Sequence, residues 1–432
     1  MSLSDPRRRA LLTGLGAAAL GCPFALAARA EAPAHGSVTA APQADTTSPE
    51  DFVSPHGLHQ AGIVTPRPAN GMVAAFDVIA DTPEELDRLF RRLTERIRFL
   101  THGGEVPQLD PRLPPADSGL LGPVIKRDAL TITVSLGASL FDDRDWLAGL
   151  KPAKLQRMEQ FPNDALDASL CHGDITIQLC ANTQDTTIHA LRDLIKSIPD
   201  QLVLRWKQEG NVPVIPPLAP GEVENARNFL GFRDGSANPD PGDEGLMGRM
   251  LWAAKGEPDW AAGGSYQAVR IIRNFVERWD RTPLREQEEV FGRTKNTGAP
   301  LDRRDGTEAD VPDYAADPEG AKTPMDSHIR LANPRDAQAE RNLMLRRPFN
   351  YSNGVTKSGQ LDQGLLFICY QADLEAGFIT VQNRLNGEPL EEYIKPVGGG
   401  YFFTLPGFSE APDDYLGRQL IRETGRTAPQ KA

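Results

Sequence analysis

Two segments of the chain hold residue types that could do chemistry together. Residues 228–239 read Asn-Phe-Leu-Gly-Phe-Arg-Asp-Gly-Ser-Ala-Asn-Pro and place Asp234 in a tight turn between glycines. Residues 325–335 hold His328, and Arg346–Arg347 follow it by 18 and 19 residues. A histidine, a carboxylate and a permanently charged arginine are a sufficient set for haem peroxide chemistry. They are equally common surface residues, so residue types alone leave both interpretations open.

The other chemistry-bearing residues give weaker patterns. His56 and His59 have the spacing of a metal-binding pair, but the sequence offers no further ligands beside them. His189 falls on a helical pattern, where packing or exposure is the simpler interpretation. Gly398–Gly400 precede a predicted strand rather than a helix, so they do not predict a phosphate-binding loop.

The composition is that of a globular protein. The chain has 432 residues, which corresponds to two or three structural units. Hydrophobic residues make up 40% and charged residues 25%, which excludes a disordered chain. The formal net charge is −12, and a chain this acidic is a poor general binder of nucleic acid, so we expect no nucleic-acid partner.

The cysteines do not form a disulfide framework. Four cysteines are too few for a disulfide-stapled scaffold. Removal of an export signal would leave Cys171, Cys180 and Cys369, which cannot all pair with one another. A Cys171–Cys180 disulfide is one alternative, but both residues flank or lie in the strand-like run Asp174–Ala181. We therefore expect buried free thiols.

The N-terminus has the features of an export signal. Within residues 1–30, basic residues precede an apolar run too rich in alanine and helix breakers to form a stable membrane anchor. Arg8–Leu12 is typical of a twin-arginine signal, and an ordinary secretory signal is the alternative. Ala28–Ala30 has the form of a signal-peptidase site. We expect residues 31–54 to form a flexible leader and the mature protein to be periplasmic or secreted.

Hydrophobic periodicity predicts two similar halves, residues 55–225 and 226–432. Each half loosely follows a β-α-β-β-α-β order, which suggests an α+β fold of two ferredoxin-like halves with antiparallel sheets. The first half has predicted strands at Gly71–Ile79, Leu130–Leu136, Asp174–Ala181 and Gln201–Trp206, and helices at Thr82–Leu100 and Asp185–Ser197. The second half has strands at Tyr266–Asn274, Gly364–Ala372 and Tyr401–Leu405, and helices at Thr282–Phe291 and Leu374–Leu385.

Two long polar stretches, Gly231–Ala262 and Gly292–Asp326, interrupt the second half. Loops of this length in a compact chain are usually functional or wrap a ligand.

The two chemistry-bearing segments resemble a known family. Gly231–Gly235 is similar to the GxxDG motif of dye-decolorizing peroxidases, and Ser327–Arg335 is similar to the segment that carries their axial histidine. Four further segments resemble the EfeB-type branch, whose members are exported by the twin-arginine route: His59–Ile63, Gly298–Leu301, Leu361–Asp362 and Gly398–Phe403. The resemblance covers residues from about 55 to 420.

The resemblance implies one haem b per chain, held in the C-terminal half. It implies that His328 is the proximal iron ligand and that Asp234 and Arg346 lie on the opposite, distal face. Arg346 rather than Arg347 aligns with the distal arginine. Further haem contacts carry over to Gly235, Ser236, Ala237, Asn333, Pro334 and Arg335.

Each of these roles has a physical reason. The second imidazole nitrogen of His328 should donate to a carboxylate or carbonyl, for which Glu391 and Glu392 are candidates. Asp234 can shuttle a proton between the two oxygens of peroxide, and Arg346 can supply fixed positive charge where the O–O bond polarises. The alternatives are a turn carboxylate for Asp234 and a salt-bridge or haem-propionate partner for Arg346.

The resemblance implies a haem peroxidase that reduces hydrogen peroxide and oxidises an organic donor. It also implies release of iron from haem with the tetrapyrrole intact, as in a deferrochelatase. The expected partners are hydrogen peroxide, an organic electron donor or haem as substrate, and components of an iron-uptake system; a homodimer is left open. A haem-binding or haem-delivery protein without turnover is the alternative, but a carrier needs no distal Asp–Arg pair.

Overall fold

The computed structural model describes residues 48, 50–215, 224–253 and 256–427. The predicted signal peptide, residues 1–30, and most of the predicted leader, residues 31–54, lie outside this part of the chain. Among the helices within the described ranges, none combines the length and the apolar character that crossing a membrane requires.

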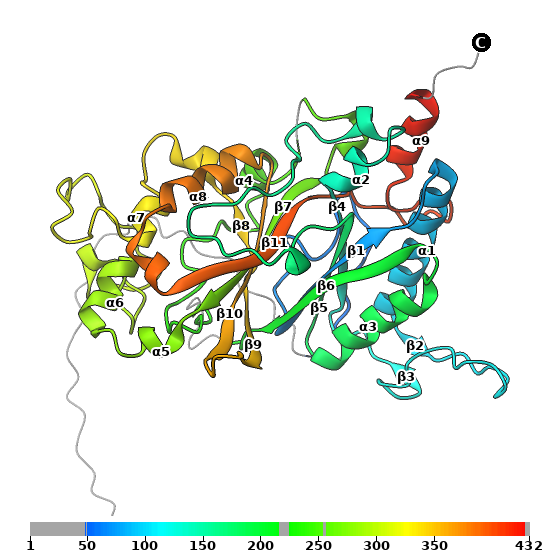
Figure 1. Cartoon of the computed structure of the whole chain (residues 1–432), viewed down its shortest axis with the longest axis horizontal. Helices are drawn as coiled ribbons and strands as arrows, with labels where there is room; N and C mark the ends of the chain where they lie inside the picture. The colour runs from blue at the N-terminus through cyan, green and yellow to red at the C-terminus, as the bar shows by residue number, and fades with distance from the viewer. Residues whose placement is uncertain (1–47, 49, 216–223, 254–255, 428–432) are drawn as a thin grey trace, which may run out of the picture. The chain divides into compact units, whose positions relative to one another are not determined.

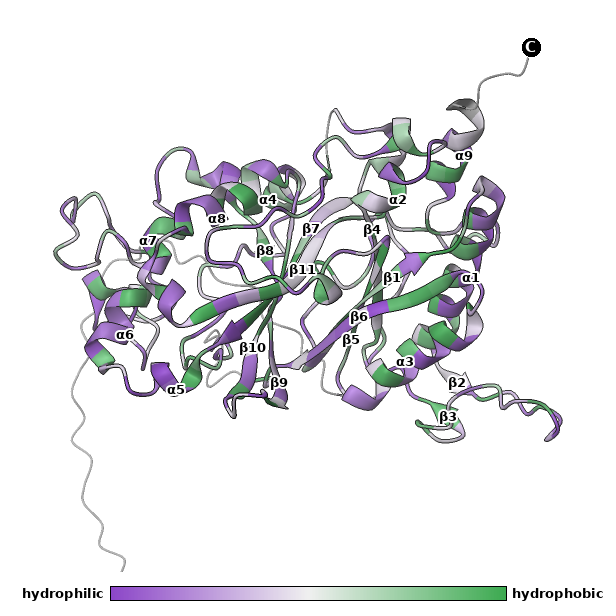
Figure 2. Cartoon of the chain, in the orientation of Figure 1, coloured by the Kyte–Doolittle hydropathy of each residue, from purple (hydrophilic) through white to green (hydrophobic). Residues whose placement is uncertain are grey.

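The N-terminal half is a four-stranded antiparallel sheet covered by two helices (Figure 1). Its strands are β1 (Asn70–Val78), β4 (Thr131–Gly137), β5 (Ile175–Ala181) and β6 (Leu202–Asn211), in the order β4-β5-β1-β6. Helices α1 (Pro83–His102) and α3 (Gln184–Ser197) pack on one face, and both alternate between hydrophobic and hydrophilic residues in Figure 2. The predicted start of α1 is confirmed, because the Thr82 side chain accepts a hydrogen bond from the Glu85 N–H.

The C-terminal half repeats this topology. Its main strands are β7 (Ser265–Asn274), β9 (Phe349–Val355), β10 (Leu361–Gln371) and β11 (Ile394–Thr404), in the order β9-β10-β7-β11. When the strands are numbered 1 to 4 along the chain within each half, both sheets have the ferredoxin-like order 4-1-3-2, read from β6 to β4 and from β11 to β9. The predicted fold class is therefore confirmed.

Short elements connect these strands. Between β7 and β9 lie α5 (Val276–Trp279), α6 (Leu284–Phe291), α7 (His328–Ala332) and the two-residue strand β8 (Leu345–Arg346). Between β10 and β11 lie a π-helical turn (Glu375–Ile379), α8 (Thr380–Leu385) and the short helix η7 (Pro389–Glu392). Elsewhere the chain forms α2 (Ala138–Asp142), α4 (Glu244–Met250), α9 (Arg418–Thr427), β2 (Gly104–Glu105) and β3 (Val124–Ile125).

Three features of the second half differ from the sequence prediction. Strand β9 was not predicted, because only Phe349–Tyr351 are buried and the four residues that follow them are exposed. The segment predicted as one helix, Leu374–Leu385, contains the wider π-helical turn. Gly398–Gly400 lie inside β11 rather than before it. A Cβ on Gly399 would lie 1.9 Å from the Val269 carbonyl oxygen, so only glycine fits where β11 and β7 pair this closely.

The two sheets join edge to edge. Strand β11 pairs with β4 through Phe402–Thr404, and β6 pairs with β9 at Asn211 and Asn350. The strand pairings therefore close into a ring that encloses a buried cluster, which includes Val73, Trp206, Ile271, Phe349, Tyr370 and Phe402. On the other face of the C-terminal sheet, side chains such as Ile272, Leu365 and Phe367 line a pocket.

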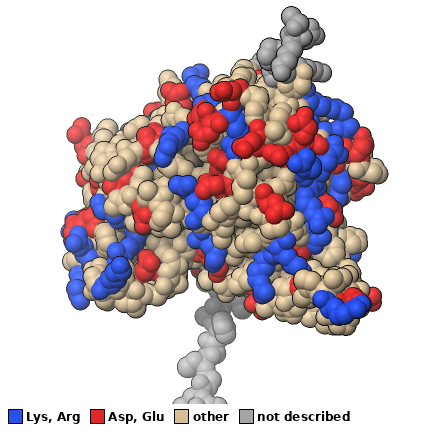
Figure 3. Space-filling model, turned by 45° about the vertical axis from the view of Figure 1, so that its right-hand side comes forward, with Lys and Arg blue, Asp and Glu red and all other residues tan. Residues whose placement is uncertain are grey.

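The remaining cysteines and histidines agree with the simpler interpretations. Cys171, Cys180 and Cys369 are buried free thiols, as predicted. His59 stacks on Trp252 with ring centroids 3.5 Å apart, and His189 is fully buried with its Nδ1 2.8 Å from a serine hydroxyl. Within the described residues no group of three or more side chains is arranged to hold a metal ion. On the face drawn in Figure 3, acidic and basic side chains are interspersed.

Candidate active site

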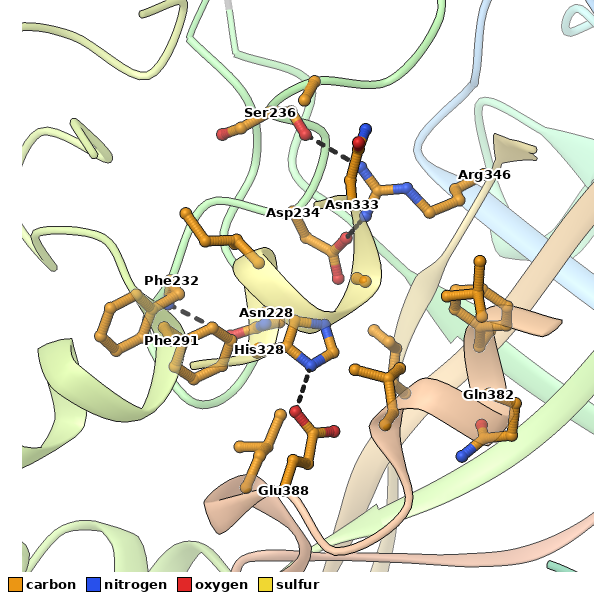
Figure 4. A pocket seen from close by; sticks show the side chains of 18 of the residues that line it. Asn228, Phe232, Asp234, Ser236, Phe291, His328, Asn333, Arg346, Gln382 and Glu388 are labelled. Atoms are coloured by element: carbon orange, nitrogen blue, oxygen red, sulfur yellow. Dashed lines mark hydrogen bonds and ion pairs between the residues drawn. The ribbon is translucent and has the colours of Figure 1, made fainter. Parts of the chain in front are cut away.

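A pocket lies over the C-terminal sheet, between its strands and the segments that carry α7, α8 and η7 (Figure 4). Its walls are largely apolar and include Phe291, Ile272, Leu365, Phe367, Val381 and Leu385. Both long polar stretches noted in the sequence contribute to the lining. The stretches therefore enclose a cavity, as their length suggested.

His328 is the first residue of α7 and lines this pocket. Its Nδ1 donates a hydrogen bond to Oε2 of Glu388 at 2.8 Å, and its ring lies edge-on to Phe291. Burial lowers the pKa of His328, but the Glu388 carboxylate outweighs this effect and raises the pKa above the ordinary histidine value. Within the described part of the chain Nε2 has no hydrogen-bond partner, so it is available to a ligand.

The acceptor for His328 corrects the sequence expectation. Glu391 and Glu392 were the candidates, and both are wrong, because Glu388 makes the contact. Glu388 immediately precedes η7 and is only 5% exposed, whereas Glu392 is exposed beside Arg278. Three acids within five residues look alike in a sequence, and only the direction of the η7 turn decides which one faces inward.

Asp234 and Arg346 meet on the opposite side of the pocket from Glu388 (Figure 4). Nη1 of Arg346 lies 3.7 Å from Oδ1 of Asp234, and Nη2 donates to the Ser236 carbonyl at 2.9 Å. Arg347 points the other way and donates to the backbone carbonyls of Ile63 and Thr65. Adjacent residues of an extended strand face opposite sides, so only Arg346 lines the pocket.

The loop that carries Asp234 is folded by its own residues. The Asn228 side chain accepts hydrogen bonds from the backbone N–H groups of Leu230 and Phe232, each at 3.1 Å. Gly231 has a φ of +86°, a left-handed conformation that glycine adopts without steric cost. The Asp234 N–H donates to the carbonyl of Ala226 at 2.9 Å, which turns the carboxylate toward the pocket.

The other residues predicted to contact a cofactor divide into two groups. Ser236, Ala237, Asn333 and Arg335 line the pocket, whereas Gly235 and Pro334 are not part of its lining. Ala237 and Arg335 have φ values of +61° and +59°, which non-glycine residues rarely adopt. Such backbone strain is concentrated at ligand-binding positions in many proteins.

Sequence reasoning missed several lining residues besides Glu388. Arg293 and Tyr314 come from the stretch Gly292–Asp326, and Met344 precedes β8. Arg293 is 7% exposed, and burial lowers its pKa. The one signal that pointed to Arg293 and Tyr314 was the length of the polar stretch, which does not identify individual residues.

The chemistry of the pocket fits a haem. His328 offers one imidazole nitrogen toward the cavity, with a carboxylate on the other nitrogen, as metal-binding histidines usually have. The apolar walls suit a porphyrin face. Arg293 and Arg335 line the pocket, and neither forms an ion pair with a carboxylate among the described residues. Nη1 of Arg293 donates to the backbone carbonyls of Gly298 and Glu308, which leaves its Nη2 and the Arg335 guanidinium available to haem propionates. Fold and site together define a haem-binding α+β protein in which a polar Asp–Arg pair lines the same pocket as His328.

Comparisons with known proteins agree with this class. Residues 60–211 match the family model described as Dyp-type peroxidase, N-terminal, and residues 225–409 match Dyp-type peroxidase, C-terminal. A protein named Deferrochelatase from Shigella sonnei is 57% identical over 425 residues, covering 97% of this chain and 98% of that protein.

Solved structures give the same result. A DyP-type peroxidase from Streptomyces coelicolor has a TM-score of 0.78 and 32% identity, covering 87% of this chain and 99% of that chain. Ferric DtpA from Streptomyces lividans has a TM-score of 0.77 and 31% identity, covering 88% and 99%.

The chain therefore belongs to the Dyp-type peroxidase family. It is an enzyme with a haem cofactor and peroxidase activity, and the resemblance read from its motifs is confirmed. A carrier without turnover is not favoured.

Proposed function

We propose that the chain is an exported enzyme that reduces hydrogen peroxide with an organic electron donor and also releases iron from haem while leaving the tetrapyrrole intact. The observation that carries the proposal is the arrangement of one pocket. His328, with Glu388 on its Nδ1, lines the same cavity as the Asp234–Arg346 pair.

His328 is the proposed iron ligand. Glu388 holds its Nδ1, which leaves Nε2 as the coordinating atom and makes it more basic. When bound, the haem supplies the redox chemistry with peroxide. The residues proposed to hold it are Ser236, Ala237, Asn333 and Arg335 in the lining, with Gly235 and Pro334 shaping the backbone beside them.

Asp234 and Arg346 are the proposed catalytic pair. Asp234 accepts a proton from hydrogen peroxide and returns it to the oxygen that leaves as water. Arg346 stabilises the negative charge that develops as the O–O bond breaks, and it remains protonated throughout. The two side chains form an ion pair at 3.7 Å without a direct hydrogen bond, so both can also contact a small substrate that lies beside them in the pocket.

Iron release is supported by the similarity to the protein named Deferrochelatase, which extends over nearly the full length of both chains. An enzyme with this activity would act with components of an iron-uptake system. Peroxide reduction and iron release can take place in the same pocket, because both reactions need haem bound at His328.

Export is supported by Arg8–Leu12 and by the cleavage-site pattern Ala28–Ala30. We place the mature enzyme in the periplasm or outside the cell, with a mature N-terminus near Glu31. The division into two halves near residue 225 is supported by the family models, which cover residues 60–211 and 225–409.

The proposal is tested by loading the mature chain with haem and measuring three products with and without peroxide: oxidised donor, free protoporphyrin and free iron. Donor oxidation that depends on peroxide supports the peroxidase activity, and protoporphyrin formed together with iron supports iron release. Loss of both activities in His328→Ala is expected. Haem binding with none of these products would instead identify a carrier.

A further inference from the structure

Glu308 is a buried acid that the proposed chemistry does not use. It belongs to the polar stretch Gly292–Asp326, yet only 7% of the residue is exposed. Its carboxylate accepts hydrogen bonds from the backbone N–H of Asn225 at 2.8 Å, from the Asn225 side-chain amide at 2.7 Å and from the Ser236 hydroxyl at 2.9 Å. Arg233 lies 3.7 Å away. These donors compensate the lost hydration of a buried carboxylate.

The partners of Glu308 are the two ends of the loop that carries Asp234. Asn225 begins this loop and Ser236 ends it, so one carboxylate closes it. The ends also touch directly, because a Cβ on Gly235 would lie 2.2 Å from Oδ1 of Asn225. A shift of Asn225 would therefore displace Gly235 and the adjoining Asp234.

Arg346 is held by the same loop. Its Nη2 donates to the carbonyl of Ser236, the residue whose hydroxyl donates to Glu308. The Asn238 side chain accepts from the Arg346 N–H at 2.9 Å and donates to the Arg346 carbonyl at 3.1 Å. The position of Ser236 thus determines where the guanidinium lies relative to Asp234 (Figure 4).

We propose that Glu308 is a positioning residue of the peroxide site, which fixes Asp234 and Arg346 through Asn225 and Ser236. This inference rests on the proposed roles of Asp234 and Arg346. Glu308 does not line the pocket, so it acts through the loop and not by contact with substrate.

Glu308→Gln is the primary test. Glutamine keeps the size of the side chain but has one acceptor oxygen, whereas the carboxylate uses both. Oε1 accepts from the Asn225 backbone N–H, and Oε2 accepts from the Asn225 side-chain amide and the Ser236 hydroxyl. At least one donor therefore loses its acceptor. A misplacement of about 1 Å can cost on the order of 10²-fold in rate, so we expect the second-order rate constant with peroxide to fall by about 10- to 100-fold. The rate of the haem-loaded protein with the organic donor, measured separately, should not change. Haem occupancy should fall less than the peroxide rate constant, because His328 and Asn333 lie outside the displaced loop.

Matched variants separate positioning from a general loss of structure. Glu319→Gln makes the same charge change at an exposed position of the same polar stretch and should have no effect. Glu308→Asp keeps both acceptor oxygens and should recover part of the rate. In the haem-free chain, backbone amides of residues 225–236 should exchange with solvent faster in Glu308→Gln than in Glu319→Gln, because Glu308 no longer joins the two ends of the loop.

The outcomes are distinguishable. A full peroxide rate in Glu308→Gln would overturn the inference. So would equal slowing of every step together with lower haem occupancy, since that pattern indicates general destabilisation. If Arg346→Leu also keeps the full peroxide rate, the proposed function of the distal pair is wrong, which is a different failure from that of Glu308 alone.

Discussion

Replacing Arg346 by leucine should slow the reaction with peroxide while leaving haem in place. The guanidinium uses Nη2 for the Ser236 carbonyl, and its Nη1 is 3.7 Å from Asp234, which is beyond hydrogen-bonding distance. Nη1 and Nε therefore have no hydrogen-bond partner among the described residues. They remain available to the charge that develops on peroxide.

The expected magnitude follows from this geometry. One fixed donor aimed at a developing negative charge is typically worth about 10²–10³-fold in rate, or about 2.7–4 kcal/mol. The Asp234 carboxylate is too distant to neutralise the guanidinium by a direct hydrogen bond, so we expect Arg346→Leu to show the full effect. Leucine should preserve β8, since the backbone of Arg346 pairs with Cys369 and with the Asn238 side chain.

Stopped-flow mixing of the haem-loaded variant with peroxide measures this step directly. Arg346→Lys is the matched variant, because it keeps the charge but loses the planar fork, and we expect an intermediate rate. A peroxide rate for Arg346→Leu within about threefold of the parent, at equal haem occupancy, would exclude the proposed role of Arg346, since one fixed donor is expected to raise the rate by at least about 10²-fold.

Three further predictions concern other parts of the chain. Asp234→Asn should slow the peroxide step on the order of 10²-fold at unchanged haem occupancy. This loss of rate should be smaller than that of Arg346→Leu, because water can replace a proton shuttle but not a fixed charge. Stopped-flow rates of the two variants show which loss is larger. Burial, with Arg157 and Arg205 nearby, lowers the pKa of His172 from about 6.5 to about 4 in the folded protein. As the pH falls from about 6.5 to about 4, the unfolded chain therefore binds a proton at His172 that the folded protein does not, and the free energy of unfolding decreases. His172→Asn, which tolerates the φ of +62°, should flatten this decline in denaturant unfolding curves, and an unchanged decline would assign it to other groups. Replacing Arg8 and Arg9 by lysine should leave precursor in the cytoplasm, and normal export on fractionation would exclude the twin-arginine route.

Much of the fold was predictable because its periodicity is local. The helix at Pro83–His102 follows from Thr82 as its N-cap, acids in its first turn and apolar residues at helical spacing. Strand β9 was not predictable, since it is half exposed and its partners lie in β6 and β10. The closure of the two sheets through β4 and β11 depends equally on long-range pairing that no local pattern encodes.

The candidate site was predictable in its residue types but not in its connections. The motif resemblance selected His328, Asp234 and Arg346, and all three line one pocket. The partner of His328 was not predictable, because Glu388 differs from its acidic neighbours only in the direction that the chain turns after α8. Glu308 had no sequence signal at all, since a buried acid within a charged stretch looks like a solvated one.

Haem titration of His328→Ala against the parent chain measures whether His328 binds the haem iron in this pocket, as we propose. The parent should bind one haem per chain with the optical spectrum of a five-coordinate histidine complex. His328→Ala should lose that spectrum or lower the haem occupancy. Unchanged occupancy together with an unchanged histidine spectrum would show that another residue binds the iron.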